Sequence, residues 1–443
     1  MNNESLEKNN INSNMRKVAL TALAGTSIEW YDFFLYGAAA ALIFPTAFFG
    51  EVPPNTALIL SLLTFAAGFI ARPIGGIIFG HFGDKIGRKK TLISALMLMG
   101  ISSTLIGLLP TYAMIGGLAP ILLTTLRFAQ GLAIGGQWGG AMLLVTESAP
   151  SNQRGYYGAF AQAGAPIGVI LANLALIITS ALVSDEFFNT WGWRIPFLAS
   201  AVLILVSMYI QLNLEDTKAF KELAVHRSEN QGDGQKTIQK SPIIVAVRKF
   251  PKRIMLAAGA FINIQVTFYI LIAFLLAYGV QSAKMARDDM LTAVLIASAI
   301  MVPMQFLFSS YSDRHGRRGI FMLGAILSGL WAFMIFPLVD TGNFWLITLA
   351  VSGGMIFLAM MYGPQAAFFT ELFSTEVRYS GATLGYQFGA IIGGAFAPTI
   401  AVKLWTELDI FWVSVYMSCS ALLTLLSVMA LTETYQTDLN ESQ

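Results

Sequence analysis

Long hydrophobic runs dominate the chain from residue 18 to residue 432. A bilayer core about 30 Å thick requires roughly 20 mostly apolar residues in each helix that crosses it. Polar turns separate the runs, and an even number of spans would place both ends of the chain on one side of a membrane. The pattern therefore predicts an all-α integral membrane protein with twelve transmembrane helices, at 18–45, 57–80, 91–110, 118–147, 157–183, 195–214, 254–281, 288–310, 319–338, 344–371, 381–402 and 410–432.

Composition agrees with this pattern. Of 443 residues, 56% are hydrophobic and 12% are charged, whereas about 25% of the residues in a soluble domain are charged. The three histidines fall in predicted loops, the single cysteine is Cys419, and no metal-binding motif is present. We therefore expect neither an enzyme nor a metal or other cofactor, and a net charge of +2 gives no reason to expect a nucleic-acid partner.

The basic residues predict the orientation. Of the 27 Lys and Arg residues, only four fall in the loops opposite the termini and two fall within helices. Cytoplasmic loops of membrane proteins carry an excess of Lys and Arg, so both termini are predicted to be cytoplasmic. On the opposite side, Trp191 and Trp193 precede the sixth span and are interpreted as an aromatic anchor at the membrane interface.

A polar stretch at 215–253 divides the predicted spans into two groups of six. We interpret it as a solvated cytoplasmic linker, with a regulatory or partner-binding role as the alternative. The predicted organisation is a disordered cytoplasmic tail (1–15), an N-terminal six-helix bundle (16–214), the linker (215–253), a C-terminal six-helix bundle (254–434) and a second cytoplasmic tail (435–443).

The two halves repeat each other. GHFGDKIGRKK (80–90) follows the second span, and SSYSDRHGRRG (309–319) follows the eighth. TESAPSNQRG (146–155) follows the fourth span, and TELFSTEVRY (370–379) follows the tenth. Repeated six-helix halves around a central site are typical of alternating-access transporters. The charged residues that recur at matching positions are Asp84, Arg88, Glu147 and Arg154 in the first half and Asp313, Arg317, Glu371 and Arg378 in the second.

These loops resemble the signature of the major facilitator superfamily. The segments SIEWYDFFLYG (27–37), ARPIGGIIFGHFGD (71–84), RFAQGLAIGGQWGG (127–140) and LLVTESAP (143–150) are similar to those of its metabolite:proton symporters, which carry shikimate, α-ketoglutarate, citrate and proline betaine. The resemblance implies two six-helix bundles around a central cavity in the inner membrane, functional as a monomer. It also implies proton-coupled uptake of a small organic solute, with a carboxylate metabolite favoured. One departure is Gln137, where the family usually has glutamate.

By the same resemblance, the eight recurring charged residues would form a gate on the cytoplasmic side. A carboxylate after one helix can cap the N-terminus of a neighbouring helix, where the macrodipole supplies partial positive charge. Asp84 would dock on the start of the eleventh helix when that side closes, and the other seven would join the network. The alternative is a simple positive-inside anchor.

Four charges lie inside predicted spans and away from their ends, and charges within a membrane mark functional sites by default. Glu29 and Asp32 are three residues apart in the first helix, Arg72 is in the second and Arg127 is in the fourth. Asp32 with Arg127 resembles the acid–arginine arrangement of proton-coupled carriers, which assigns proton coupling to Asp32 and Arg127, with Glu29 as a further candidate. The alternative is a permanent structural ion pair.

Polar and aromatic side chains in other spans could bind substrate or form interhelical hydrogen bonds. Glycines at 131, 135 and 139 repeat every four residues and predict close helix packing. The second functional hypothesis is a proton-driven antiporter that exports an amphipathic compound, because GAPIG (164–168) loosely resembles an antiporter motif. The candidate substrate-binding residues are Tyr31, Tyr36, Arg72, Gln130, Gln137, Gln162, Asn263, Gln265, Gln365 and Gln387.

Overall fold

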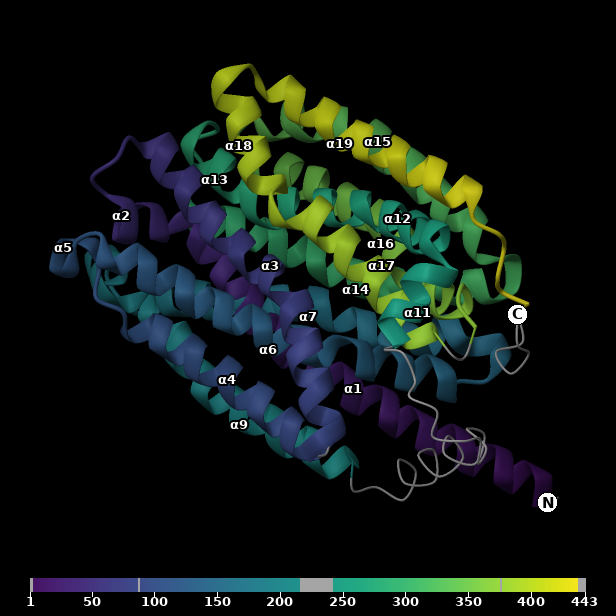
Figure 1. Ribbon diagram of the computed structural model, residues 1–443. Helices are drawn as coiled ribbons and strands as arrows, with labels where there is room; N and C mark the ends of the chain where they lie inside the picture. The colour runs from purple at the N-terminus through teal and green to yellow at the C-terminus, as the bar shows by residue number, and fades with distance from the viewer. Residues whose placement is uncertain (1–2, 87, 216–241, 375–376, 437–443) are drawn as a thin grey trace.

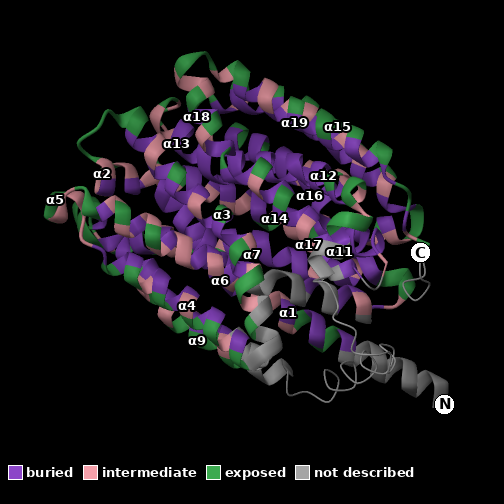
Figure 2. Ribbon diagram, viewed as in Figure 1, coloured by how far each residue is buried: buried purple, intermediate pink, exposed green. Residues whose placement is uncertain are grey.

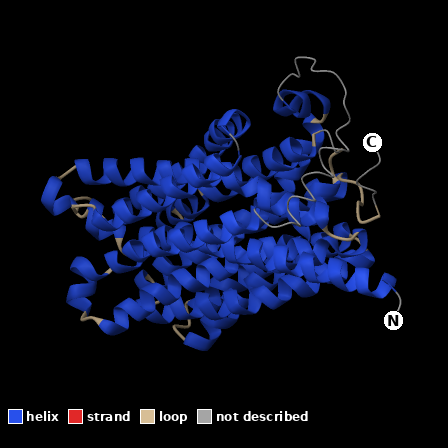
Figure 3. Ribbon diagram, turned by 90° about the horizontal axis from the view of Figure 1, so that it is seen from below, coloured by secondary structure: helices blue, strands red, loops and turns tan. Residues whose placement is uncertain are grey.

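The computed structural model describes residues 3–86, 88–215, 242–374 and 377–436. Side chains at 3–14, 80, 81, 83–86, 88, 89, 92, 136–141, 143, 144, 148, 210–215, 242–245 and 379 lie outside the described part. The described residues form helices joined by loops and turns, and no strand occurs among them (Figure 3).

Twelve long helical segments correspond in order to the twelve predicted spans, which confirms the all-α architecture (Figure 1). Two of these segments, the seventh and the eleventh, are interrupted by a π-helical turn. The first six are α1 (Asn3–Leu42), α3 (Pro54–Ile86), α4 (Arg88–Leu108), α6 (Leu118–Ser148), α7 (Arg154–Leu182) and α9 (Arg194–Glu215). The second six are α12 (Pro251–Tyr269) with η3 (Ile270–Phe274) and α13 (Leu275–Gln281), α14 (Arg287–His315), α15 (Arg317–Val339), α16 (Phe344–Glu371), α17 (Arg378–Ala390) with η4 (Ile391–Ala395) and α18 (Ala397–Glu407), and α19 (Ile410–Ala430).

Among the described residues, nine helices are long and apolar enough to cross a membrane, and one bent pair raises this number to ten. The bent pair joins Asp185–Gly192 to Arg194–Tyr209 at 54°. The two remaining predicted spans correspond to α1 and to α4, whose apolar part is Ile93–Leu108. Short elements fill the turns: α2 (Phe44–Phe49), α5 (Tyr112–Ile115), η1 (Ser151–Gln153), α8 (Asp185–Phe187), η2 (Phe188–Gly192) and α11 (Pro242–Lys249).

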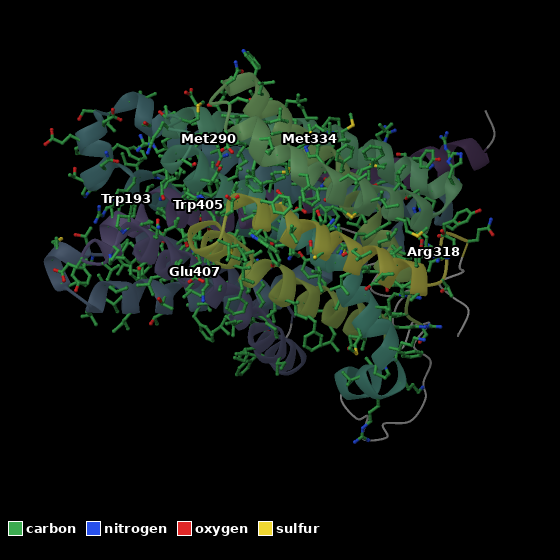
Figure 4. All side chains as sticks on the ribbon, turned by 90° about the horizontal axis from the view of Figure 1, so that it is seen from above. Trp193, Met290, Arg318, Met334, Trp405 and Glu407 are labelled. Carbon is green, nitrogen blue, oxygen red and sulfur yellow. The ribbon has the colours of Figure 1, made fainter. Side chains whose placement is uncertain are left out.

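The start of α1 and the end of α19 lie at the same end of the bundle, which we call the termini end (Figure 1). The opposite end, which we call the far end, carries α2, α5, α13 and α18. Arg318 lies at the termini end, and Trp193 and Trp405 lie towards the far end (Figure 4).

The two halves meet about a pseudo-twofold axis. Thr146, near the end of α6, and Thr370, near the end of α16, hold equivalent positions in the sequence repeat. Their hydroxyl groups are 3.1 Å apart, and both side chains are fully buried. Equivalent residues can touch only where the symmetry axis passes between them, so this contact marks the axis.

Glycines bring α3 and α6 into backbone contact. A methyl group at Gly131 would collide with the carbonyl oxygen of Gly68, and one at Gly135 would collide with that of Arg72. Only a residue without a side chain permits this approach. The predicted packing role of these two glycines is confirmed, and the contact places Arg72 of α3 beside the helix that carries Arg127.

The seventh and eleventh helices are interrupted near mid-length by the π-helical segments η3 and η4. An i→i+5 turn leaves the regular hydrogen-bond ladder and is frequent at functional sites. η4 packs against α12 and α3, so it joins the two halves. Residues just before η3 line the cavity described below, and Gly394 of η4 lies against one of them, Tyr269.

Helices extend into two segments that the sequence predicted to be a tail and a linker. The expected disordered tail at 1–15 is helical from Asn3, because no proline interrupts the chain between Asn3 and Leu42 and the first span extends backwards in register. The expected linker at 215–253 contains the helix α11 from Pro242 to Lys249, and α12 already begins at Pro251. Residues 216–241 lie outside the described part.

The predicted aromatic anchor holds for only one of its tryptophans. Trp191 is 44% exposed, as an interfacial residue should be, but Trp193 is fully buried. The Trp193 ring packs against Phe44, Phe48 and Phe197. The π-helical turn at 188–192 turns Trp193 into the bundle, a change of direction that the sequence pattern does not reveal.

Candidate functional site

A small cavity lies at the centre of the molecule, between the two halves. Its volume of ≈ 10 Å³ is about that of one water molecule. The helices around it are the most deeply buried part of the bundle (Figure 2). Six of the lining residues are aromatic, and the full set is Trp30, Phe34, Ala165, Ile264, Gln265, Phe268, Tyr269, Leu358, Tyr362 and Tyr386. The cavity is therefore closed around its centre and must open before a metabolite can enter.

Arg72 of α3 lies next to residues that line this cavity. Its guanidinium carbon is 5.3 Å from the centre of the Trp30 ring and 4.6 Å from that of Phe69. Its charge also acts on Tyr269, Tyr362 and Tyr386, which line the cavity from the second half. The side chain is 1% exposed, and its Nε and Nη2 atoms have no hydrogen-bond partner among the described residues. Arg72 therefore offers unused N–H donors beside the cavity.

Arg127 of α6 is held by a hydrogen bond and by a second set of aromatic rings. Its Nη1 donates to Oε1 of Gln130 at 3.1 Å, and Nε2 of Gln130 donates to the Ser103 hydroxyl at 2.7 Å. The guanidinium carbon also lies 4.3 Å from the centre of the Tyr36 ring and 4.6 Å from that of Phe65. Gln130 therefore fixes Arg127 in place, with one amide group bridging α6 and α4.

Asp32 is 1% exposed on α1. The hydroxyl groups of Ser103 and Ser200 and the guanidinium of Arg127 lie close enough to act on its carboxylate. Neither carboxylate oxygen, however, has a hydrogen-bond partner among the described residues, and no described ion pair joins Asp32 to Arg127. In this conformation the two predicted coupling residues are neighbours that are not paired.

The other predicted residues on α1 occupy different environments. Glu29 is only half-buried, unlike Asp32. The Tyr31 hydroxyl donates to the carbonyl oxygen of Pro196 at 2.8 Å, which ties α1 to α9. The Tyr36 hydroxyl is 2.7 Å from that of Thr64. Tyr31 and Tyr36 therefore position α1 in this conformation.

Glutamine side chains connect the halves beside the cavity. Nε2 of Gln162 in α7 donates to Oε1 of Gln365 in α16 at 2.7 Å, and to the carbonyl oxygen of Tyr362 at 3.3 Å. Gln265 lines the cavity, and its Nε2 has no partner among the described residues. Nε2 of Gln365 and Oε1 of Gln387 are likewise buried without a described partner. These amides retain hydrogen-bonding capacity for a ligand.

Asn263 lies in a different cluster, between α12, α15 and α19. Its Oδ1 accepts from Thr267 and Ser420, each at 3.0 Å, and its Nδ2 donates to Ser328 at 3.2 Å. Its backbone N–H donates to the Thr424 hydroxyl at 3.0 Å. The Asn263 side chain is fully engaged and does not line the central cavity, so this placement favours its structural role over the predicted substrate contact.

The signature loop of the second half closes the termini end. Asp313, near the end of α14, accepts the backbone N–H groups of Gly155 at 2.8 Å and Tyr156 at 2.9 Å. Both donors belong to the first turn of α7 in the other half, where the helix dipole favours a negative charge. Asp313 therefore caps a helix across the interface, as the repeat predicts for its counterpart Asp84.

Arg317 supports this cap. It forms ion pairs with Asp313 at 2.6 Å and with Glu371 at 3.1 Å, and its side chain is fully buried. Gly316, between α14 and α15, has a φ of +99°. Glycine adopts this conformation at little cost, and it allows the sharp turn between the two helices. A third ion pair, Arg378 to Glu147 at 3.4 Å, joins the two halves directly.

Arg154, at the start of α7, lies near Glu371 and joins the same charged group. Of the eight predicted gating residues, six are therefore gathered at the termini end. The side chains of Asp84 and Arg88, and that of the predicted substrate residue Gln137, lie outside the described part.

The halves also touch at the far end. Arg287, in the first turn of α14, donates to the Ser180 hydroxyl of α7 at 2.7 Å, and its guanidinium lies 3.9 Å from the centre of the Phe188 ring. The Asn173 amide donates to the carbonyl oxygen of Leu291 at 3.1 Å. A separate hollow of ≈ 210 Å³ opens nearby between α2, α3 and α13. Because the two halves touch each other at both ends, the conformation is occluded.

Two residues of the site were missed from the sequence. Phe33 packs against both arginines, and Ser103 anchors Gln130. Phe33 directly follows Asp32 in a segment that resembles the family, and this position was the one available signal. Its side chain is apolar, like most of its neighbours, so the residue type did not indicate a role. Ser103 is one of many serines in apolar helices, and only its contacts distinguish it.

Comparison with known proteins agrees with this arrangement. The family profile described as Major Facilitator Superfamily matches residues 22–384. The inner membrane metabolite transport protein YhjE of Escherichia coli K12 is 39% identical over 426 residues, 94% of each chain. The shikimate transporter of the same organism is 37% identical over 94% of each chain, and its proline/betaine transporter is 32% identical over 88% of this chain and 78% of the relative.

Among solved structures, the xylose transporter XylE from E. coli in a partially occluded inward-open conformation superposes with a TM-score of 0.72. The match covers 96% of this chain and 100% of that chain at 17% identity, so it supports the fold alone.

Two symmetry-related helical halves closed around a buried, charged centre define a membrane transporter. The chain belongs to the major facilitator superfamily, and its long apolar helices are those of a multi-pass membrane protein of that family.

Proposed function

We propose that this protein is a proton-coupled symporter that takes up a small organic carboxylate by alternating access. The observation that carries the proposal is an imbalance of buried charge. Two guanidinium groups, Arg72 and Arg127, and one unpaired carboxylate, Asp32, are buried in the interior of the first half, and Arg127 lies close to Asp32. A charge inside a membrane protein is costly unless it is paired, so a bound anion would supply the missing partner.

Arg72 is the residue that we propose to bind the substrate carboxylate. Its free Nε and Nη2 atoms are two donors of a planar fork that matches a carboxylate. The aromatic lining suits the carbon skeleton of the substrate, and the free amide of Gln265 suits an oxygen acceptor on it. The shikimate transporter of E. coli, a relative of this chain, is named for a compound of this class.

Asp32 is the residue that we propose to carry the proton. Burial favours the neutral form of a carboxylic acid, and a nearby arginine favours the ionised form. Because Asp32 is buried beside Arg127 without pairing to it, a small movement of either residue would change which form is favoured. Such a group can take up a proton in one conformation and release it in another.

We propose that the termini end faces the cytoplasm, on the basis of the excess of Lys and Arg on that side. With Cys419 replaced by serine, a membrane-impermeant thiol reagent applied to intact cells should label a cysteine at Met114 and spare one at Arg314. Both positions are exposed and lie at opposite ends of the bundle. Labelling of the Arg314 position from outside would reverse the assignment.

Purified protein in proteoliposomes tests the coupling. With an alkaline interior, labelled shikimate should accumulate inside, and a protonophore that collapses the proton gradient should abolish the accumulation. Glycine betaine serves as a second probe, because it carries the same carboxylate with an added positive charge. Extrusion of a preloaded amphipathic dye under the same gradient, without carboxylate uptake, would favour the antiporter; the aromatic lining of the cavity is the observation in its favour.

In the same assay, Arg72→Gln should weaken the apparent affinity for the carboxylate about ten- to hundredfold. This is the size expected when a hydrogen bond loses its charged partner. Lys403→Gln is the matched control, since it removes one positive charge from an exposed position on α18. Equal affinities for wild type and Arg72→Gln would remove Arg72 from the binding site.

A further inference from the structure

One aromatic ring is shared by the two buried arginines. The guanidinium carbon of Arg72 lies 4.3 Å from the centre of the Phe33 ring, and that of Arg127 lies 4.1 Å from it. Phe33 is 1% exposed and directly follows Asp32 on α1. A cation within about 6 Å of an aromatic ring centre is attracted to the ring face, and more strongly where water is excluded.

The neighbouring rings each serve one arginine only. Phe69 stacks with Arg72 at 4.6 Å, and Phe65 stacks with Arg127 at 4.6 Å. Phe33 touches both of these rings, with centroid distances of 5.0 Å to Phe65 and 5.3 Å to Phe69. Among the described aromatic side chains, Phe33 alone has both guanidinium groups over its ring face.

We propose that Phe33 is the positioning residue that couples the substrate arginine to the proton site. This inference rests on the proposed function and adds to it the physical link between its two parts. Arg72 holds the substrate carboxylate, Arg127 responds to the charge on Asp32, and the Phe33 ring fixes the distance between them. When Asp32 takes up a proton, Arg127 loses its nearest anion and interacts more strongly with the ring.

The ring has little freedom to absorb that change. It is enclosed by Trp30, Phe34, Phe65, Phe69 and Tyr269, with ring centroids 5.0 to 6.1 Å away. Packed interiors transmit displacements because few voids are available. Movement of Arg127 against Phe33 therefore reaches Arg72 and the cavity on the other side, and by thermodynamic linkage substrate binding acts back on Asp32.

The experiment measures substrate affinity at two pH values in the full-length protein. The probe is labelled shikimate, or whichever carboxylate accumulates in the proteoliposome assay above. For wild type, the ratio of Kd at pH 8 to Kd at pH 6 should be about fivefold or more, the usual range for coupled sites. In Phe33→Leu this ratio should fall by about threefold or more, the size expected when buried cations lose an aromatic face.

Phe65→Leu and Phe69→Leu are the matched controls, since each removes a ring from one arginine only. Either control should change the absolute Kd but keep the wild-type pH ratio. A Phe33→Leu variant with the wild-type ratio would overturn the inference, as would an equal loss of the ratio in all three variants. If Phe33→Leu does not fold, Phe33→Met takes its place, because its flexible side chain removes the ring and can adapt to the space that remains. A wild-type Kd independent of pH, with no proton-driven uptake, would instead overturn the proposed function itself.

Discussion

Asp32→Asn should abolish accumulation of substrate against a gradient while exchange of labelled for unlabelled substrate continues. Asparagine has nearly the shape of aspartic acid but stays neutral, so it imitates the protonated state permanently. The site could bind substrate and change conformation, but no proton could be released to complete a coupled cycle. Proteoliposomes measure both quantities, accumulation under an imposed proton gradient and exchange without one, and we expect at least a hundredfold loss of the first (about 3 kcal/mol of lost driving force).

Glu29→Gln is the control for this prediction. Glu29 lies on the same helix three residues earlier, but it is half-buried where Asp32 is 1% exposed. We expect Glu29→Gln to retain accumulation. Retention in Asp32→Asn together with loss in Glu29→Gln would show that the other carboxylate carries the proton. Retention in both variants would exclude the first helix from coupling.

Asp313→Asn should open the termini end. The aspartate caps α7 of the opposite half with two hydrogen bonds of 2.8 and 2.9 Å, and it pairs with the buried Arg317 at 2.6 Å. The amide retains one acceptor oxygen but loses the charge, which is worth up to about 2 kcal/mol at a partly buried helix N-terminus. Weakening of the buried ion pair adds to this loss. The open population should therefore rise about tenfold or more, and transport should slow.

The measurement is the reaction rate of a cysteine at Thr370 with a soluble maleimide, in a background where Cys419 is serine. Thr370 is fully buried against Thr146 at the interface of the halves, so it reacts only when that interface opens. Asp340→Asn is the matched control. Asp340 accepts a hydrogen bond of 2.6 Å from the Tyr278 hydroxyl towards the far end, and it does not contact the charged residues at the termini end. An unchanged rate in Asp313→Asn would mean that this cap does not hold the gate. The same effect at Asp84 remains a prediction from the repeat.

The sequence alone determined the architecture and indicated which charged loops meet at the termini end. A membrane span requires a long apolar run, and a turn between spans requires polar residues, so each helix could be recognised without knowing its neighbours. The repeated charged loops then related the halves, and the structure confirms the repeat through the Thr146–Thr370 contact and the cap that Asp313 forms. The apolar runs and the charged loops could be predicted because each is formed by residues close together in sequence.

The composition of the site was only partly predictable. Charges inside apolar helices are rare and costly, so Asp32, Arg72 and Arg127 could be identified individually. Which groups they contact was not determined. The sequence suggested an Asp32–Arg127 pair and a substrate role for Gln130, whereas in the structure Gln130 fixes Arg127 and leaves Asp32 unpaired.

Only the tertiary structure decided which face of each helix looks inward. Lipid is as apolar as leucine, so hydrophobicity does not distinguish a lipid-facing side chain from one packed in the bundle. The same ambiguity explains why Asn263 was expected in the cavity and why Trp193 was expected at the membrane interface. It also explains why Phe33, an apolar residue among many, became recognisable only when α3 and α6 brought two arginines to its ring. The sequence determined which residues enter the membrane, and the packing of helices determined which of them meet.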